Sequence, residues 1–527
     1  MVAASSPSST PKPPPTPLPT TAVDDLDDDI DVRALVDAES GPSNLADLVA
    51  RNAVERPEEP ALIQPGEDRR VLTWSELDGQ VSALAAGLVR HGVRAGHRLA
   101  FRGPTSIPYV VGYLSALRAG VVVVPLAVRA GTELSARWLA ESGARLLLGV
   151  ADMPTGSEIE TLPLTAAGIA ELADPGAAPV VSPPDRESLA VLLYTAGTAE
   201  EPRPVMLSHR ALLAGIDETG PGRPDADSVI GLALPLSGAY GLAAILGSWI
   251  GAGCRLVVSD ERADLARLAA DESITHLPLT PPLIFRLLQR ATHAGTDLRA
   301  MLASVVAVVS AGARLPWPLT REFSEQTGLR LEQAYGLTET ARGVSSTLGA
   351  ELLGPGHVGR ALPGVEIRIG DGTDDEPGEI AVRGEMLFSG YWPDGAGGPD
   401  PDGWWRTGDL GYLRGEDLFV LDRARDLISI SGFTIYPAEV EQVIGELEGV
   451  TAVAVIGAPA GRAGQRMVAF VSGTASPDEV LDYCRGRLAA FKRPSEVRSV
   501  DQLPRTVTGL IRRGALRRLL AAERADG

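Results

Sequence analysis

The stretch that decides the fold is Tyr194 to His209, which reads YTAGTAEEPRPVMLSH. It follows the apolar run Leu189 to Leu193, a pattern typical of a buried strand. Near its end, Ser208 is a suitable cap for a helix that begins with HRALLAGI. A strand, a loop of small and hydroxyl residues and then a helix often bind phosphate, because the loop N–H groups point at the anion. The loop residues expected to approach a phosphate are Thr195, Gly197 and Thr198. A surface turn in an α/β domain is the alternative, and the spacing of a Walker loop is absent.

The totals of the chain fit a large domain followed by a smaller one. The chain has 527 residues, of which 44% are hydrophobic and 22% charged, as in ordinary globular proteins. Its net charge of −20 argues against non-specific binding to nucleic acid or to an anionic membrane. A site for ATP would therefore have to gather positive charge locally.

Cysteine content and hydropathy indicate the compartment. The only cysteines are Cys254 and Cys484, so a disulfide framework is not expected and a reducing environment is the default. No apolar run reaches the length of a membrane span, and the N-terminus does not have the pattern of a signal peptide. We expect a soluble, cytoplasmic protein with no membrane span.

The N-terminal region differs from the rest in composition. Residues 5–21 are rich in serine and proline, and residues 24–31 are mostly aspartate. Neither segment can bury a core, so residues 1–32 are expected to form a disordered tail. From residue 44 onward, strand patterns alternate with helix patterns, as in 71–92 and in 97–127. This alternation predicts parallel sheets covered by helices.

The order of the downstream motifs resembles the superfamily of adenylate-forming enzymes, which includes acyl-CoA synthetases, peptide-synthetase adenylation domains and luciferases. The family's LTYxEL and LKAGxAYVPI are matched by LTWSEL (72–77) and LRAGVVVVPL (117–126), and its YTSGTTGxPKGVxxSH by the stretch quoted above. That stretch departs from the pattern at five positions, which are Ala196, Ala199, Glu200, Arg203 and Pro204. Arg203 stands where the family has lysine, and it keeps one positive group beside the expected triphosphate.

The resemblance implies a fold and a two-step reaction. The fold is α/β, with a large N-terminal adenylate-forming domain (33–424) of parallel and mixed sheets covered by helices and a small mobile α/β C-terminal domain (425–527). The hinge lies near Arg425, which lets the small domain rotate between two half-reactions. In the first, ATP and Mg²⁺ activate a carboxylic acid to an acyl-adenylate. In the second, the acyl group passes to CoA, or to a carrier protein as the alternative acceptor.

The segment LRLEQAYGLTETA (329–341) and later motifs carry the expected nucleotide site. By resemblance, Tyr335 stacks on the adenine, because a flat base favours an aromatic face. Thr338 donates to phosphate or carboxylate, and Glu339 holds Mg²⁺, a hard cation that prefers carboxylate oxygen. Asp409 in TGD accepts from the ribose hydroxyls. Two basic residues complete the set: Arg423 resembles the ribose-contacting arginine, and Lys492 in FKRP matches the family's YKxP.

The acid pocket is expected to have walls from residues 233–242, 308–315 and 333–340, where Ala, Gly and Ser are frequent. Ser237 and Gly238 replace the aromatic–His pair that gates the acyl site in relatives, and Ala311 and Gly312 follow a buried strand. Small residues at these places favour a roomy apolar acid, of the fatty or aryl kind. The alternative is that the gate at Ser237 and Gly238 is no longer used, which the same two small residues would also fit.

The end of the chain decides how much of the activity survives. The family closes with PRTxSGKIxRxxLR, whose lysine contacts the acyl carboxylate and the α-phosphate during adenylation, whereas this chain reads PRTVTGLIRRGALRR (504–518). Leu510 stands in the lysine's place. Losing one preorganised donor costs about 2.7–4 kcal/mol, or roughly 10²–10³ in rate. Three hypotheses follow: a ligase with impaired adenylation, an enzyme that uses supplied acyl-adenylate, or a non-catalytic nucleotide- or acyl-binding pseudoenzyme.

Overall fold

The computed structural model describes residues 41–149, 159–181, 185–197, 201–216, 220–370, 377–430, 433–460, 465–506 and 509–525. The chain divides after Gly41, and Pro42–Gly527 form one compact unit. The architecture below is that of this unit, and the predicted tail 1–32 lies outside the described residues.

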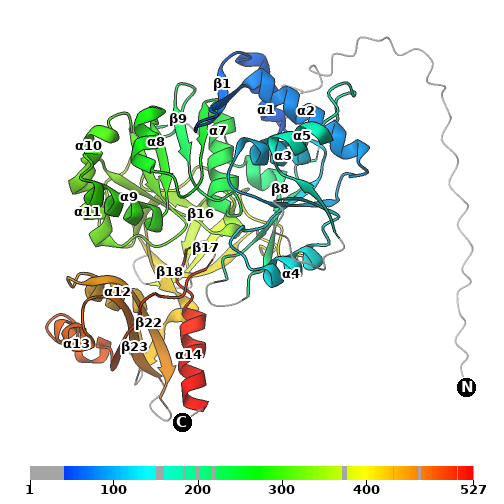
Figure 1. Cartoon of the computed structure of the whole chain (residues 1–527). Helices are drawn as coiled ribbons and strands as arrows, with labels where there is room; N and C mark the ends of the chain where they lie inside the picture. The colour runs from blue at the N-terminus through cyan, green and yellow to red at the C-terminus, as the bar shows by residue number, and fades with distance from the viewer. Residues whose placement is uncertain are drawn as a thin grey trace, which may run out of the picture. The chain divides into compact units, whose positions relative to one another are not determined.

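A six-stranded sheet holds the strand that opens the phosphate loop. Its order is β6-β5-β3-β4-β7-β8, and all neighbours are parallel except β7 and β8. The strands are β3 (Arg98–Arg102), β4 (Val122–Pro125), β5 (Leu146–Gly149), β6 (Glu160–Pro163), β7 (Leu189–Tyr194) and β8 (Pro204–Ser208). The connecting helices are α2 (Trp74–Arg90), α3 (Ile107–Arg118), α4 (Thr132–Ser142) and α5 (Ala166–Leu172). The predicted strand–helix alternation is therefore confirmed in this half (Figure 1).

The second sheet has thirteen strands and changes character along its length. Strands β1 (Pro60–Gln64), β10 (Arg255–Val258), β9 (Val229–Leu232), β11 (His276–Leu279), β12 (Ala307–Ser310) and β13 (Leu331–Tyr335) run parallel in that order, and β2 (Arg70–Thr73) closes one edge. An antiparallel half continues through β14 (Ser345–Ser346), β15 (His357–Ala361), β19 (Asp417–Arg423), β18 (Trp405–Arg414), β17 (Gly378–Arg383) and β16 (Glu366–Ile369). Parallel and mixed sheets were predicted, and both large sheets are mixed, with mostly parallel strands in the six-stranded sheet and in one half of this one.

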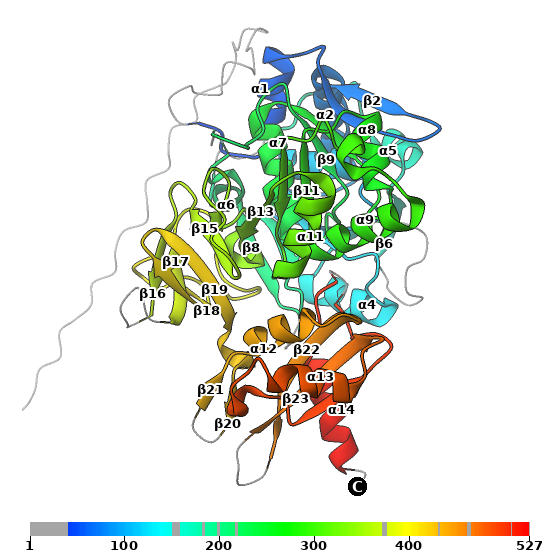
Figure 2. The same ribbon diagram turned by 90° about the vertical axis from the view of Figure 1, so that its left-hand side faces the viewer.

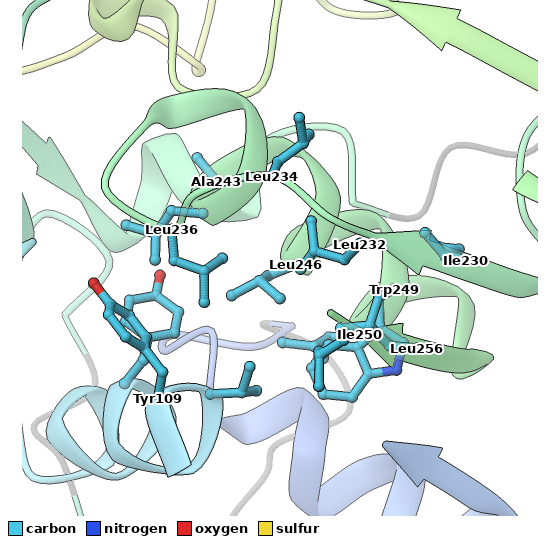
Figure 3. Close-up of a cluster of buried hydrophobic side chains, with 14 of the residues drawn as sticks. Tyr109, Ile230, Leu232, Leu234, Leu236, Ala243, Leu246, Trp249, Ile250 and Leu256 are labelled. Atoms are coloured by element: carbon cyan, nitrogen blue, oxygen red, sulfur yellow. The ribbon is translucent and has the colours of Figure 1, made fainter. Parts of the chain in front are cut away.

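Helices cover the parallel half of this sheet. They are α1 (Asp47–Glu55), the π-helix η2 (Tyr240–Ile245), α7 (Leu246–Ala252), α8 (Leu265–Asp271), α9 (Pro281–Ala294), α10 (Leu298–Met301) and α11 (Trp317–Thr327). Helix α11 contacts β13 and α9, and the three elements can be followed in Figure 2. The large core joins the two sheets: Trp249 of α7 stacks on Trp74 of α2 with ring centroids 5.2 Å apart. Figure 3 shows Trp249 and Leu246 among residues of β9, β10 and α3.

The C-terminal residues form a three-stranded sheet with its own hydrophobic clusters. Its strands are β22 (Val450–Pro459), β23 (Gln465–Gly473) and β24 (Glu496–Ser499), preceded by the hairpin β20 (Ile428–Ile430) and β21 (Phe433–Ile435). Val455 packs with helices α12 (Pro437–Gly445) and α13 (Pro477–Arg485), whereas its neighbours Ala454 and Ile456 pack with α14 (Arg513–Ala525). This period of two is what a sheet covered on both faces requires.

One helix of this region is shorter than its sequence predicts. The stretch 476–491 is expected to be helical throughout, but α13 ends at Arg485, with Gly486 as its C-cap. Residues Ala490–Lys492 form a separate 3₁₀ turn. Glycine disfavours helix continuation by about 1 kcal/mol relative to alanine.

The buried His209 makes stability depend on pH. It follows β8 in helix α6 (His209–Leu213), and its Nδ1 accepts from Leu45 N at 3.4 Å. Burial lowers its pKa from 6.5 to about 4. Between these values the unfolded chain binds the extra proton, so stability is complete above pH 6.5 and falls as the pH drops towards 4. His209→Gln, which keeps an acceptor, should make this fall shallower by up to about 1.4 kcal/mol per pH unit in urea titrations. Parallel stability curves for the two proteins would contradict the assignment.

Candidate functional site

The phosphate loop connects two antiparallel strands. Thr195 N donates to Arg203 O at 2.9 Å, and Arg203 N donates to Thr195 Oγ1 at 2.9 Å, so the ends of the loop are tied together. Gly197 has a φ of +63°, which glycine adopts without strain. Thr198 lies outside the described residues.

The predicted order of strand, loop and helix is wrong in one respect. Strand β8 lies between the loop and helix α6, and Ser208 caps this helix by accepting from Ala211 N at 3.4 Å. The run PVMLS pairs with β7 because Val205 and Leu207 provide alternating buried side chains. The helix N-terminus is therefore not at the loop, and anion binding there would depend on loop N–H groups and side chains.

A second group joins three residues from separate strands. Tyr335 ends β13, Asp409 lies in β18 and Arg423 ends β19, which pairs Asp409 directly opposite Arg423. Tyr335 Oη donates to Asp409 Oδ2 at 2.8 Å, and Arg423 Nε lies 2.9 Å from Asp409 Oδ1. Both oxygens of this buried carboxylate are engaged, so its orientation is fixed.

The charges of this group depend on each other. Burial raises the pKa of Asp409, whereas the Arg423 guanidinium lowers it. Burial and the Asp409 carboxylate both raise the pKa of Tyr335, which stays protonated and able to donate. Burial alone would lower the pKa of Arg423, but Asp409 and neighbouring groups raise it. The result is an ionised pair with an aromatic ring beside it, which suits a sugar hydroxyl and a base.

The turn after Tyr335 places two further predicted residues. Thr338 and Glu339 begin the 3₁₀ turn Thr338–Thr340, which Leu337 N stabilises by donating to Thr340 Oγ1 at 2.9 Å. Glu339 is buried, and its Oε1 accepts from Tyr391 Oη at 2.7 Å. Among the described residues no three Asp, Glu, His or Cys side chains converge into a metal site. Mg²⁺ is usually held by one or two carboxylates together with substrate phosphates, and Glu339 is a buried carboxylate that could serve as one of them.

The C-terminal predictions concern Lys492 and Leu510. Lys492 Nζ lies 2.7 Å from both oxygens of Glu439. The half-buried Leu510 is held by its backbone: its N donates to Thr506 Oγ1 at 3.0 Å and its O accepts from Thr506 N at 2.7 Å. Nearby, Arg513 Nη2 lies 2.7 Å from both oxygens of Glu441, so this guanidinium is engaged elsewhere.

A cavity of about 220 Å³ begins next to Tyr335, since the preceding residue Ala334 lines it. Other lining residues are Tyr240, Ser248, His276, Val309 and Arg342. Each of the three predicted wall segments contributes at least one residue. The four named pocket residues lie close by on the same segments, but Ser237, Gly238, Ala311 and Gly312 are not themselves among the lining residues.

The cavity is partly polar. Arg342 Nη2 donates to Ser248 Oγ at 3.2 Å, and Tyr240 Oη donates to Val309 O at 2.8 Å. Burial lowers the pKa of His276, which favours the neutral ring. Its volume is below the ~300–1,000 Å³ of typical small-molecule pockets. The expected roomy apolar pocket is therefore small and carries several hydrogen-bonding side chains.

The family model for AMP-binding enzymes matches residues 49–392, and the model for the AMP-binding enzyme C-terminal domain matches residues 439–510. The chain belongs to the AMP-binding enzyme family. Its relatives include the feruloyl-CoA synthase of an Amycolatopsis species, 32% identical, with 85% of this chain and 94% of the relative covered. The 4-coumarate–CoA ligase 5 of Oryza sativa subsp. japonica is 29% identical, with 91% and 95% covered.

Solved structures agree with this assignment. ATP-bound MatB from Rhodopseudomonas palustris superposes with a TM-score of 0.81 at 27% identity, covering 90% of this chain and 99% of MatB. The predicted family, fold and acid–thiol ligase activity of this AMP-binding enzyme are thus confirmed, with ATP, Mg²⁺ and CoA as its cofactors and substrates. In the part of the chain that the structure describes, no helix is long and apolar enough to cross a membrane.

The sequence of this AMP-binding enzyme did not predict two residues that lie at the site, Tyr391 and Arg342. Tyr391 lies in the run SGYW (389–392), and it contacts Glu339 from 52 positions away. Arg342 follows AYGLTETA, and it reaches the cavity because the chain turns back at Ala341, which has a φ of +44°. The only signal in the sequence is that each residue lies in or next to a motif and carries a polar group, a hydroxyl in Tyr391 and a guanidinium in Arg342.

Proposed function

We propose that this AMP-binding enzyme joins a compact aryl carboxylic acid to CoA through an acyl-adenylate, with a first step slowed by Leu510. The observation that carries the proposal is the Tyr335–Asp409–Arg423 group directly beside the cavity. A nucleotide bound at this group would place its α-phosphate towards Thr338, and an acid in the cavity would present its carboxylate there.

The nucleotide roles follow from the chemistry of each side chain. Asp409 accepts from the ribose hydroxyls, Arg423 keeps that carboxylate ionised, and the Tyr335 ring contacts the adenine. The Gly197 N–H group, with the Arg203 guanidinium, binds the β- and γ-phosphates. Glu339 would hold Mg²⁺, which neutralises charge on the phosphates when bound.

The acid class is proposed from the cavity and supported by the relatives. A volume of about 220 Å³ is small for a long alkyl chain, and the cavity is lined by the polar side chains of Ser248, His276 and Arg342. The names of two relatives specify feruloyl and coumarate groups. An aryl acid with an oxygen substituent opposite its carboxylate fits both the small, partly polar cavity and the names of these relatives.

The acid class is tested by ATP–pyrophosphate exchange with hydroxycinnamic, benzoic and hexadecanoic acids, followed by mass detection of CoA thioesters. We expect slow exchange with the hydroxycinnamic or benzoic acids and at least tenfold less with hexadecanoic acid. The Leu510→Lys protein serves as the sensitive reference for weak exchange. Thioester formation with hexadecanoic acid alone would overturn the proposed class, and no exchange in either protein would overturn the adenylation step.

A second function is favoured specifically by Leu510. An enzyme that performs only the thiol-transfer step would need the nucleotide site but not the lysine. Incubation with synthetic acyl-adenylate and CoA separates the two functions, because thioester would form from acyl-adenylate while exchange stays absent. ATP binding without either product would indicate the non-catalytic alternative.

A further inference from the structure

Tyr391 contacts two groups of the proposed site at once. Its Oη donates to Glu339 Oε1 at 2.7 Å, and Arg203 Cζ lies 3.4 Å from the centroid of its ring. Glu339 is the proposed magnesium carboxylate, and Arg203 is the cation of the phosphate loop. These two residues are 136 positions apart in sequence, and one side chain lies between them.

We propose that Tyr391 is a positioning residue that orients Glu339 towards Mg²⁺ and holds the Arg203 guanidinium beside the phosphates. This inference rests on the proposed function. The Tyr391 hydroxyl fixes one carboxylate oxygen of Glu339, so the other oxygen can point towards the ion. Residues that hydrogen-bond to metal ligands orient them in the same way in other metal sites. A guanidinium over an aromatic ring keeps its edge N–H groups available while its flat face is covered.

The backbone around Tyr391 is built to hold the ring in place. Tyr391 bridges Val205 and Ala396, and its N donates to Ala396 O at 3.1 Å. Trp392 N donates to Pro204 O at 2.9 Å, so the segment is attached to β8 directly after Arg203. Because Arg203 and Tyr391 approach from paired segments, their stacking does not depend on the rest of the loop.

Neighbouring side chains complete the enclosure. Phe388 packs edge-on against the Tyr391 ring with centroids 5.0 Å apart, and its N donates to Glu339 O at 2.9 Å. A Cβ added at Gly397 would lie 3.2 Å from ring carbons of Tyr391 and 3.8 Å from Arg203 Nη2.

This arrangement bears on the altered phosphate loop. The loop carries Glu201, which pairs with Arg137 at 2.9 Å on the exposed side. The ion pair with Arg137 engages the Glu201 carboxylate, while the Arg203 guanidinium stays on the Tyr391 ring. The loop can therefore present a cation to a triphosphate although its sequence departs from the family pattern.

The test uses three variants and two readouts. Tyr391→Phe removes only the hydroxyl, Arg203→Met removes only the cation, and Tyr391→Leu removes hydroxyl and ring. ATP binding is measured by calorimetry across a series of Mg²⁺ concentrations, and exchange kinetics supply KM for ATP. Tyr412→Phe is the matched control, because it also removes one tyrosine hydroxyl, but from a ring that stacks on Phe419.

Tyr391→Phe should raise the Mg²⁺ concentration for half-maximal ATP binding by about 10- to 100-fold, as for other outer-shell residues. Arg203→Met should weaken ATP binding at saturating Mg²⁺ with little change in the Mg²⁺ midpoint, and Tyr391→Leu should show both effects. An unchanged Mg²⁺ midpoint in Tyr391→Phe would overturn the inference. If the wild-type protein binds no ATP at any Mg²⁺ concentration, the proposed function fails instead.

Discussion

Replacing Leu510 with lysine is expected to raise the rate of ATP–pyrophosphate exchange by roughly 10²–10³. The physical reason is that an ammonium group stabilises the negative charge that builds on the acyl carboxylate and the α-phosphate, which leucine cannot do. The local backbone should tolerate the change, since the turn is closed by Thr506 through main-chain atoms of Leu510. Exchange of radiolabelled pyrophosphate into ATP with a saturating aryl acid measures the effect.

The controls for this substitution separate charge from shape. Leu510→Met supplies an unbranched side chain without charge and should leave exchange near the wild-type rate. Leu510→Arg restores charge with a planar fork and should recover less than lysine, because the site needs a compact point charge. If lysine and methionine give the same rate, the missing ammonium does not limit adenylation.

Replacing Asp409 with asparagine is expected to weaken ATP binding by roughly 10- to 160-fold. Hydrogen bonds to a charged group contribute about 1.5–3 kcal/mol, and asparagine cannot supply the ionised acceptor for the ribose hydroxyls. The substitution also leaves the Arg423 guanidinium, 2.9 Å from the carboxylate, without its counter-ion, which lowers the stability of the free and the ATP-bound protein alike. Calorimetric titration with ATP and Mg²⁺ gives the affinity.

Tyr335→Phe is the matched control, since it removes the 2.8 Å bond to Asp409 while the aromatic ring stays. A single hydrogen bond contributes about 0.5–1.5 kcal/mol, so this variant should bind ATP roughly 2- to 12-fold more weakly. Melting temperatures of both variants distinguish weaker binding from unfolding. ATP affinity that survives in Asp409→Asn but collapses in Tyr335→Phe would reverse the roles given to the two residues.

The strand–helix alternation of the large domain could be predicted because each element carries its own pattern of burial. Strand β4, for example, is a run of apolar residues that is buried at every position. Strand β8 was missed because PVMLS is short, begins with proline and follows a polar loop. Its place in the sheet depends on pairing with β7 and with residues near 391, which the local sequence does not encode.

Residues of the site could be predicted only where they belong to a motif of the family. Asp409 and Tyr335 meet across 74 positions, and their assignment came from the resemblance rather than from spacing. Tyr391 was not predicted because its contacts with Glu339 and Arg203 come from residues far away in the sequence. The cavity was expected in the correct segments, but its volume and polarity depend on Arg342 and His276, which come from other elements.

The central claim is that the nucleotide site works while the first half-reaction lacks its ammonium group. The most direct measurement compares wild type and Leu510→Lys in thioester formation from supplied acyl-adenylate and CoA, alongside exchange in the same preparations. We predict equal rates of thioester formation in the two proteins and a difference of at least 10²-fold in exchange. Equal exchange rates, or thioester formation slowed in wild type by the same factor as exchange, would contradict the account.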